Sequence, residues 1–471
     1  MQDQRDRTLA VNTLLLSIGQ FVPKLIAMLT LPILTTYLTK EEFGLYDLAN
    51  SMVSLIVPLM TMQIQQVAFR YLVLAKDRRE KTEYMSTALA FITASSLVFF
   101  GLIYLVLHLM GDYSPLQNLL ICLFLISESC FRLFGQLVRG LGYNLKYSVG
   151  VVLFSVFQLL LSALLLMAVP GGVVGAFAAF TISYLVAIAY MFVSARVWQY
   201  VRWRHVSLTT MREMLRLSMP IVPSSISLWV VNLSNRIVIG GAMGLEANGI
   251  YAVANKIPNL FSMAYTTFNL AWTESATLAV EQDDQDAYYS RMTNQLIRFL
   301  TGVMLLLIAV TPLLFRFFIN EQYREAFTHM PILFFGVFFS SMVSFYGAIY
   351  VAIRRTAQVG VSSAMGALLN IAINLLLIRS WGLYAASVST AVSYLVICLY
   401  RMYDLNRVVK IRYDVGAIVR AMLCFAAAAL LCCANTVWST VLTLLLAIVY
   451  NVWENGPMLL GIVKMLRRRC G

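Results

Sequence analysis

Long apolar runs, each about the length of a membrane-spanning helix, follow one another along almost the whole chain. A helix that crosses the hydrocarbon core of a bilayer needs about 20 mostly apolar residues. The breaks between the runs are short, and none has room for a soluble domain. Because lipid cannot satisfy backbone polar groups, we expect an all-α polytopic membrane protein. The sequence predicts about fourteen spans, at 11–37, 44–69, 84–109, 117–138, 148–168, 174–195, 217–239, 250–278, 295–317, 328–351, 359–378, 383–403, 415–434 and 437–453.

The composition of the 471 residues excludes a soluble globule. Hydrophobic residues make up 60% of the chain and charged residues only 12%, whereas soluble domains carry about 25% charged residues. The net charge is +13, which in a soluble protein would suggest a nucleic-acid partner. In a membrane protein, such a charge must first be compared with the positive-inside rule.

The distribution of Lys and Arg accounts for most of this charge. If the N-terminus is cytoplasmic, the segments on that side carry nearly all basic residues that lie outside the spans or at their ends, Arg401 among them. The opposite side holds only Lys40, Arg316, Arg324 and Arg379. This asymmetry predicts that both termini are cytoplasmic. The charge then reflects topology and contact with anionic lipid, and no nucleic-acid partner is needed.

Other signals are absent from the sequence. The first apolar stretch, Leu9–Leu38, is longer than the apolar region of a signal peptide, so we expect it to remain as a spanning helix. The seven cysteines and three histidines show no metal-ligand spacing. No catalytic motif is found either, so the sequence predicts neither a cofactor nor an enzyme.

Three pairs of segments indicate an internal repeat. GLYDLAN at 44–50 corresponds to GIYAVAN at 249–255, and FVP at 21–23 to IVP at 221–223. GAFAAFTISYLV at 175–186 corresponds to AASVSTAVSYLV at 385–396. The repeat unit holds an even number of spans, so both copies enter the membrane from the same side, as in transporters with parallel repeats. We therefore expect six-helix lobes at 1–200 and 201–412, followed by two extra spans and a basic cytoplasmic tail at 413–471.

Several charged residues lie within or close to the predicted spans, where a charge costs at least about 2.5–3.5 kcal/mol. Glu128 and Arg132 are four residues apart and are expected to pair on one helix face. Arg70, Glu274 and Arg298 lie close to predicted span ends, from which their side chains can reach the interface. The remaining three are Lys24, Arg236 and Lys256.

Lys24, Arg236 and Lys256 have no acidic residue three or four positions away. Prolines lie close to them, and proline allows a helix to bend. Cations beside bending helices suggest a water-filled cavity that receives an anion; the alternative is a buried ion pair with another helix. The predicted hinge prolines are Pro23, Pro220, Pro223 and Pro258.

Deep basic groups outnumber deep acidic ones. Only Glu128 and Glu274, with Asp47 near a span entry, oppose the cations. An antiporter of cationic drugs would need carboxylates in its cavity, whereas a cationic cavity fits a phosphate-bearing substrate. Before the seventh span, Thr210–Glu213 matches a capping box and predicts the start of a charged helix at the membrane surface.

Taken together, the motifs resemble those of the Wzx-type polysaccharide flippases, members of the oligosaccharidyl-lipid/polysaccharide exporter family. The resemblance covers nearly the whole chain and rests on segments 32–35, 42–46, 69–71, 218–223, 234–236 and 249–256. It implies two six-helix lobes around a central cavity and alternating-access transport of undecaprenyl-pyrophosphate-linked oligosaccharides. Family members often have Asp before the span 7 arginine, where this chain has Asn235. The loss of this neighbouring charge favours anion contact by Arg236.

The resemblance predicts a protein of the bacterial cytoplasmic membrane that acts in surface polysaccharide biosynthesis, such as that of O-antigen or capsule. The expected cationic site comprises Lys24, Arg236, Lys256, Arg70 and Arg132, with Glu128 and Glu274 as coupling or structural carboxylates. The expected partners are the lipid-linked oligosaccharide, membrane lipids, a polysaccharide polymerase and glycosyltransferases. Three alternatives remain open: a flippase for a peptidoglycan precursor, a multidrug or cation antiporter, and a membrane scaffold without transport.

Overall fold

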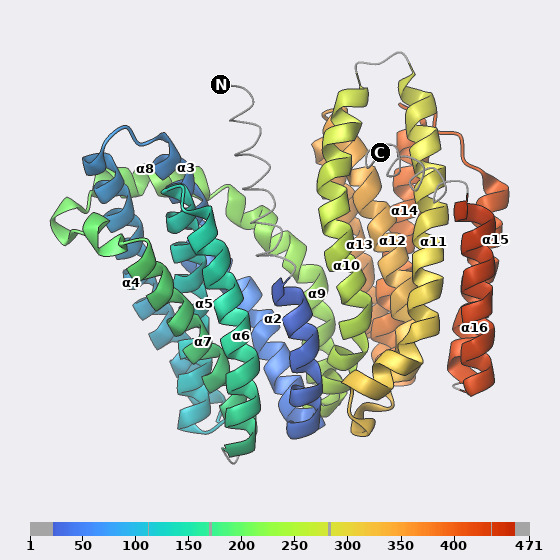
Figure 1. The fold of residues 1–471 in the computed structure, drawn as a ribbon, viewed down its shortest axis with the longest axis horizontal. Coiled ribbons are helices and arrows are strands. Elements are labelled where there is room, and N and C mark those ends of the chain that lie inside the picture. Colours follow the sequence, from blue (N-terminus) through green and yellow to red (C-terminus); the bar gives the residue numbers. More distant parts are fainter. Residues whose placement is uncertain (1–21, 112, 169–171, 281–283, 435, 457–471) are drawn as a thin grey trace, which may run out of the picture. The chain divides into compact units, whose positions relative to one another are not determined.

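The computed structural model describes residues 22–111, 113–168, 172–280, 284–434 and 436–456. These residues are helical almost throughout, and no strand occurs among them. The chain divides into two compact units, Met1–Arg236 and Ile237–Gly471 (Figure 1). The predicted basic tail and the first part of the first predicted span lie outside the described residues.

The described part of the first unit begins with the helix Val22–Tyr37. It continues with α2 (Lys40–Thr61), α3 (Ile64–Leu74), α4 (Arg78–Met110), α5 (Pro115–Gly140), α6 (Asn144–Ala168), α7 (Gly172–Ser194), η1 (Val197–Tyr200), η2 (Trp203–His205) and α8 (Leu208–Ser218). The division between the units falls within α9 (Ile221–Met243).

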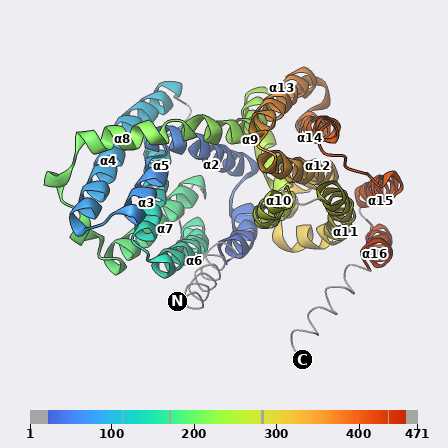
Figure 2. The ribbon, with the colours of Figure 1, turned by 90° about the horizontal axis from the view of Figure 1, so that it is seen from above.

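The second unit continues from α9 with α10 (Leu245–Ala279), α11 (Gln285–Phe318), η3 (Glu321–Tyr323), α12 (Ala326–Ala352), α13 (Thr356–Trp381), α14 (Leu383–Asn406), α15 (Val415–Ala434), α16 (Val437–Tyr450) and the π-helical turn η4 (Asn451–Asn455). Figure 2 shows α15 and α16 beside α11, which both of them contact.

Helix packing repeats between the two units. In the first, α7 packs against α5 and α6, and α5 packs against α3. In the second, α14 packs against α12 and α13, and α12 packs against α10. The two copies of the GLYDLAN-like segment lie in the first turns of α2 and α10. The structure thus agrees with the sequence repeat in both the order and the packing of the helices.

Eleven helices among the described residues are long and apolar enough to cross a membrane. The shorter apolar helix Val22–Tyr37 corresponds to the first predicted span. The helices α9 and α10 occupy the positions of two further predicted spans, although they are outside the eleven. The all-α membrane fold is therefore confirmed, and the total of about fourteen spans stays a prediction.

The second predicted span, 44–69, is not one continuous helix. Met62 and Gln63 adopt left-handed backbone conformations, with φ of 45° and 55°, and separate α2 from α3. The Gln63 side-chain oxygen accepts hydrogen bonds from Gln65 Nε2 (3.0 Å) and Gln66 Nε2 (2.8 Å). This local polar network stabilises a backbone conformation that apolar periodicity alone does not reveal.

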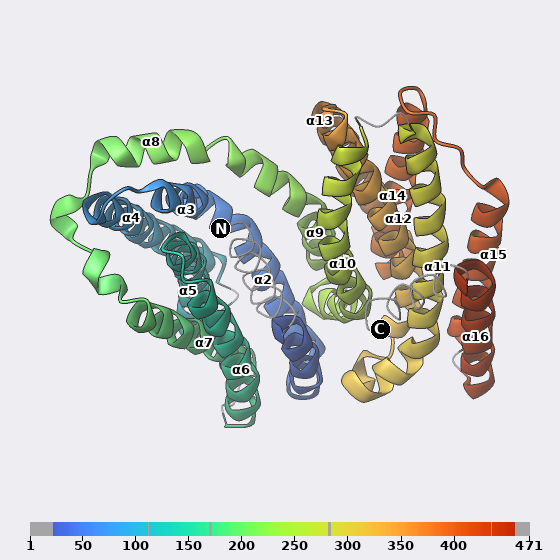
Figure 3. The same cartoon turned by 45° about the horizontal axis from the view of Figure 1, so that its top comes forward.

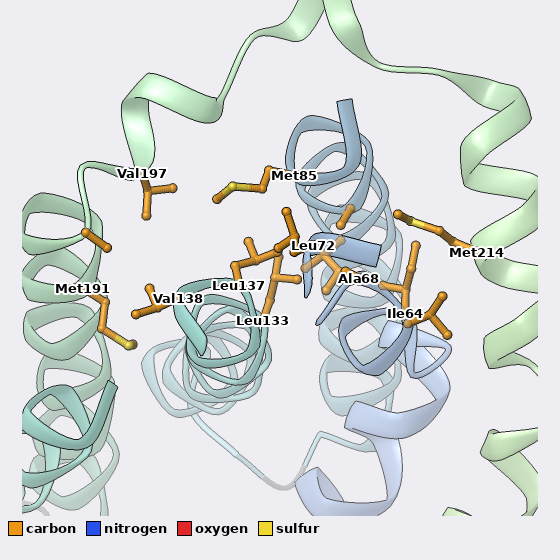
Figure 4. Packing of buried hydrophobic residues seen from close by; sticks show 14 residues of the cluster. Ile64, Ala68, Leu72, Met85, Leu133, Leu137, Val138, Met191, Val197 and Met214 are labelled. Atoms are coloured by element: carbon orange, nitrogen blue, oxygen red, sulfur yellow. The ribbon is translucent and has the colours of Figure 1, made fainter. Parts of the chain in front are cut away.

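A compact apolar cluster holds the α8 end of the first unit together. Ile64, Leu72 and Leu137 are fully or almost fully buried between α3, α4 and α5, and Met214 of α8 packs into the same cluster (Figure 4). In Figure 3, α8 runs alongside α3 and α4, both of which it contacts. The apolar face of this short helix is therefore docked on the unit, as expected for an amphipathic helix.

The start of α8 differs from the predicted capping box. Ser207 is its N-cap and accepts a hydrogen bond from the backbone N–H of Thr210 (3.2 Å). The Thr210 hydroxyl instead donates to Glu83 of α4. The predicted charged helix before the seventh span is present, but it begins one turn earlier because Ser207 also satisfies an early backbone donor.

Candidate functional site

Arg236, which the sequence left without a countercharge, pairs with a carboxylate of another helix. Its Nε lies 2.5 Å from Oδ2 of Asp47 in α2. The Asp47 side chain is 4% exposed and that of Arg236 is 14% exposed. Arg236 therefore forms the buried ion pair with another helix that the sequence left open as the alternative. Its partner lies 189 positions earlier in the chain, beyond the reach of any helical spacing.

The predicted pair of Glu128 and Arg132 is confirmed on α5. Arg132 Nε donates to Glu128 Oε1 at 2.9 Å, and a second nitrogen of the same guanidinium contacts that oxygen. The Glu128 side chain is only 9% exposed, whereas 42% of the Arg132 side chain is exposed. The carboxylate therefore lies on the inner side of the pair and orients a guanidinium that remains partly accessible.

An aromatic cluster surrounds this part of α5. Tyr184 of α7 stacks on Phe154 of α6 with ring centroids 4.2 Å apart, and Phe131 lies 5.3 Å from Tyr184. Phe124 contacts the same group through Phe180 at 5.5 Å. Such packing restricts the rotation of the helix that carries the ion pair, so the position of the guanidinium is set by rigid elements.

Lys24 and Arg70 also belong to the first unit. Lys24 is half-buried in the helix Val22–Tyr37, and Arg70 is exposed on α3. The residues beside Arg70 are structural: Phe69 lies under the guanidinium of Arg139 at 5.2 Å, and Tyr71 meets Tyr84 edge-on at 5.0 Å. The motif around Arg70 thus holds α3 against α4 and α5.

Lys256 and Glu274 lie in the second unit, both on α10. Lys256 is half-buried, and Glu274 is exposed. Among the described residues, no ion pair forms to Glu274. The structure therefore places Lys24, Arg70, Arg132 and Arg236 in one unit and Lys256 in the other.

The four predicted hinge prolines occupy different environments. Pro258 lies inside α10, as predicted. Pro220 separates α8 from α9 and so ends one helix before the next begins, while Pro223 lies in the first turn of α9. The predicted span 217–239 placed both prolines inside one helix, but the structure places them before or within the first turn of α9, where a missing backbone N–H is tolerated. Pro23 lies in the first turn of the described part of its helix.

Arg401 of α14 was not recognised from the sequence, which placed it on the cytoplasmic surface. It is only 2% exposed. Its Nε donates to Ser362 Oγ at 3.0 Å and Nη1 to the carbonyl of Val343 at 2.6 Å. Its Nη2 donates to Ser363 Oγ at 3.1 Å and to the carbonyl of Val359 at 3.2 Å. This guanidinium joins α12, α13 and α14 through neutral acceptors.

Arg298 was expected to reach the membrane interface on its own, but it forms part of an ion-pair network. It contacts Asp414 at 2.5 Å and Glu454 at 3.2 Å, and Glu454 also contacts Arg420 at 2.7 Å. The backbone N–H of Ala417 and the guanidinium of Arg298 together hold the pKa of Asp414 below its ordinary value. The network attaches α15 and α16 to α11 at one end of the second unit.

The described residues contain no group of three or more His, Cys, Asp or Glu side chains that could hold a metal ion. The chemistry that the residues above offer is recognition of charge by oriented guanidiniums.

Comparison with known proteins identifies the family. The model of a family described as polysaccharide biosynthesis protein matches residues 9–273, more than half of the chain. The chain belongs to this polysaccharide biosynthesis protein family. A search of curated proteins finds no match.

Solved structures share the fold of this polysaccharide biosynthesis family member. The lipid II flippase MurJ in an inward closed conformation matches with a TM-score of 0.72 and 12% identity, over 96% of this chain and 100% of that one. An inward-facing MATE multidrug resistance transporter of the MOP superfamily matches with a TM-score of 0.68 and 14% identity, over 84% and 98%. A mutant of the Vibrio cholerae MATE transporter VcmN matches with a TM-score of 0.55 and 12% identity, over 85% and 98%.

These findings confirm the resemblance to polysaccharide flippases that the sequence motifs predicted. The family membership and the apolar helices together indicate a multi-pass membrane protein of polysaccharide biosynthesis with the fold of these transporters. Identities of this size establish the fold alone, so the substrate has to be argued from the residues of this chain.

Proposed function

We propose that the protein is a flippase that moves undecaprenyl-pyrophosphate-linked oligosaccharide units across the bacterial cytoplasmic membrane, for the synthesis of a surface polysaccharide. The observation that carries this proposal is the arrangement of the two ion pairs of the first unit. In each pair the carboxylate is the more buried partner and the arginine the more accessible one.

This arrangement suits an anionic substrate. A buried carboxylate offsets much of the cost of placing an arginine within the membrane. The guanidinium has five N–H donors, so a carboxylate that binds one edge leaves donors suited to phosphate oxygens. Arg132, with 42% of its side chain exposed, is in our proposal the main contact for the pyrophosphate.

Lys24, Arg236, Arg70 and Lys256 complete the proposed cationic site. Arg236, held by Asp47, is the more enclosed of the two paired arginines. Lys24 supplies a compact ammonium with a flexible stem. We propose that Lys256 of the second unit also contacts the substrate and that bending at Pro23 and Pro258 accompanies alternating access. In this proposal, glycosyltransferases assemble the lipid-linked oligosaccharide, and a polymerase receives it after transport.

A flippase for a peptidoglycan precursor is the first alternative, because it would carry the same pyrophosphate. A drug or cation antiporter is the second alternative. One observation favours examining it, because Glu274 is an exposed carboxylate on α10. In the first unit, however, Asp47 and Glu128 are each less exposed than the arginine with which they pair, so a cationic substrate would meet the wrong charge first. The flippase proposal therefore fits the described residues better.

The experiment is rescue of surface polysaccharide synthesis in cells that lack this protein, with each variant expressed at the wild-type level. The variant Glu128→Gln/Arg132→Gln removes both charges but keeps two side chains that can hydrogen-bond to each other. Because the guanidinium is the proposed phosphate contact, we expect at least a tenfold loss of polymer (about 1.4 kcal/mol). Adding Lys24→Gln to this double variant should reduce polymer synthesis further.

The matched control is Arg379→Gln, which removes an exposed arginine of α13 outside the proposed site. It should leave polymer synthesis unchanged. Full synthesis with both Glu128→Gln/Arg132→Gln and Lys24→Gln would contradict the cationic site. Rescue of a strain without a peptidoglycan-precursor flippase would favour the first alternative, and drug export that depends on Glu274 would favour the second.

A further inference from the structure

The second unit contains a cavity of about 680 Å³ where α11 ends and α16 begins. We call it the α11–α16 pocket. Its apolar walls come from Leu313 and Phe315 of α11 and from Val437 and Val441 of α16. Arg316 and Arg324 lie at the same pocket, together with Glu321. The pocket therefore combines an apolar wall with a polar rim.

The apolar residues of this wall are open to their surroundings. The exposed fractions of Leu313 and Val437 are 55% and 79%. In a soluble protein such a surface would be a liability, but in a membrane helix it faces lipid. The pocket is large enough to hold part of a lipid molecule rather than only a small ion.

The rim carries more positive than negative charge. Arg316 and Arg324 are both exposed, and one carboxylate, Glu321, opposes them at 3.9 Å from Arg324. The N-terminus of α16 begins beside the same pocket, and its partial positive charge adds to that of the arginines. The described residues of the rim thus favour an anion.

The rarity of cations on this side strengthens the argument. With the orientation that the positive-inside rule predicts, the basic residues outside the spans or at their ends on the extracytoplasmic side are only Lys40, Arg316, Arg324 and Arg379. Two of these four line one pocket. Positive charges that are scarce on a face and gather at an apolar cavity are unlike charges placed for topology alone.

We propose that the α11–α16 pocket binds a membrane phospholipid with an anionic headgroup. The headgroup phosphate lies between Arg316 and Arg324, and an acyl chain covers Leu313, Val437 and Val441. A lipid fits better than a free phosphate ion because the wall beside the cations is apolar. This site is separate from the proposed cationic site, whose residues lie on other helices.

Bound lipid would complete the attachment of α16 to the unit. Arg298 of α11 pairs with Asp414, directly before α15, and with Glu454 of η4, which follows α16. These pairs lie about 27 Å along α11 from Arg316, at 1.5 Å per residue. The lipid would join the same helices at the opposite end, where the described residues provide no ion pair between them.

The test is native mass spectrometry of the full-length protein, titrated separately with phosphatidylglycerol and phosphatidylcholine. We expect the wild type to bind phosphatidylglycerol more tightly. Arg316→Gln/Arg324→Gln should weaken that binding about tenfold or more. It should weaken phosphatidylcholine binding much less, because the choline ammonium of that lipid already offsets the charge of its phosphate. Glu321→Gln should strengthen phosphatidylglycerol binding, because it removes the opposing carboxylate. Since all three residues are exposed, these variants should elute as the wild type does in size-exclusion chromatography.

The matched control, Arg379→Gln, removes a cation predicted to lie on the same side but outside the pocket, and it should bind both lipids like the wild type. Val437→Asn/Val441→Asn should weaken the binding of both lipids, because it makes the apolar wall polar. If Arg316→Gln/Arg324→Gln kept the preference for phosphatidylglycerol, or if Arg379→Gln lost it equally, the proposal would be wrong. Displacement of the lipid by glycerol phosphate at equal concentration would assign the pocket to free phosphate esters and would overturn the lipid proposal.

Discussion

The two units build corresponding positions from opposite kinds of side chain. The SYLV segments at 183–186 and 393–396 align α7 with α14, and the same offset aligns Met191 with Arg401. Met191 is fully buried in an apolar cluster and packs against Gly150 of α6. Arg401 is equally enclosed but makes four hydrogen bonds to α12 and α13. One helix-packing geometry therefore accepts either an apolar or a charged side chain when its neighbours are matched to it.

A second pair of positions shows the same contrast in the other direction. Asp47 of GLYDLAN corresponds to Ala252 of GIYAVAN. Asp47 pairs with Arg236 in the first unit, whereas Ala252 is 1% exposed within the second. The repeat thus preserves the packing of backbone and helices, while the charges distinguish the copies. We infer that the fold follows from the repeat and that the function follows from its departures.

Exchanging the residues of the first pair should produce the largest effect. Met191→Arg places a guanidinium in an apolar cluster without the serine and carbonyl acceptors that surround Arg401. An unpaired buried charge costs several kcal/mol, so we expect loss of folded protein in detergent-solubilised membranes. Fluorescence-detected size-exclusion chromatography measures the folded fraction.

The reverse exchange, Arg401→Met, should be milder. It loses four hydrogen bonds, each worth about 0.6–1 kcal/mol inside a membrane protein, but a methionine side chain fills much of the same volume. If Met191→Arg were tolerated as well as Arg401→Met, the two sites would not be matched to their residues and the comparison would fail.

Removing the carboxylate of the second pair should have an intermediate effect. Asp47→Ala leaves a largely buried arginine without its acidic partner and should cost about 3 kcal/mol. Asp47→Ala/Arg236→Met should recover most of this loss, because it removes both charges. Unfolding curves of the single and double variants give the coupling energy. A coupling near zero would show that the pair contributes nothing to the first unit.

The smallest effect concerns the carboxylate of Asp414, which pairs with Arg298 in the second unit. Because the pKa of Asp414 is lowered in the folded protein, its contribution to stability is present above the unfolded pKa of about 3.9. That contribution disappears as the pH falls through the lower folded value. Asp414→Asn should therefore be less stable than the wild type at pH 7 and closer to it at pH 3. Thermal melting at the two pH values checks this, and an equal difference at both would contradict it.

Local sequence patterns predicted the helices, the repeat and the ion pair of Glu128 with Arg132. Each of these depends on residues close together in the chain or on periodic apolar runs. The contact of Asp47 with Arg236 was beyond such patterns because it joins distant helices. Arg401 was misplaced because its position near a span end looked like cytoplasmic surface, and its acceptors come from two other helices.

The break at Met62 and Gln63 shows a different limit. The apolar run from 44 to 69 continues through this break, so hydropathy did not predict the separation of α2 from α3. The left-handed backbone is supported by the side chain of Gln63 and its bonds to Gln65 and Gln66. A cluster of polar residues within an apolar run was the available signal, although its effect on the backbone depends on geometry that composition does not encode.

The central claim is that oriented guanidiniums of the first unit receive a phosphate-bearing lipid. The most direct measurement is transbilayer movement in proteoliposomes of an oligosaccharide linked to undecaprenyl pyrophosphate, compared with a neutral glycolipid that carries the same sugar. Our account predicts that the wild type moves the charged lipid at least about ten times faster, and that Glu128→Gln/Arg132→Gln abolishes this preference. Equal rates for the two lipids, or a preference that survives in the variant, would contradict it.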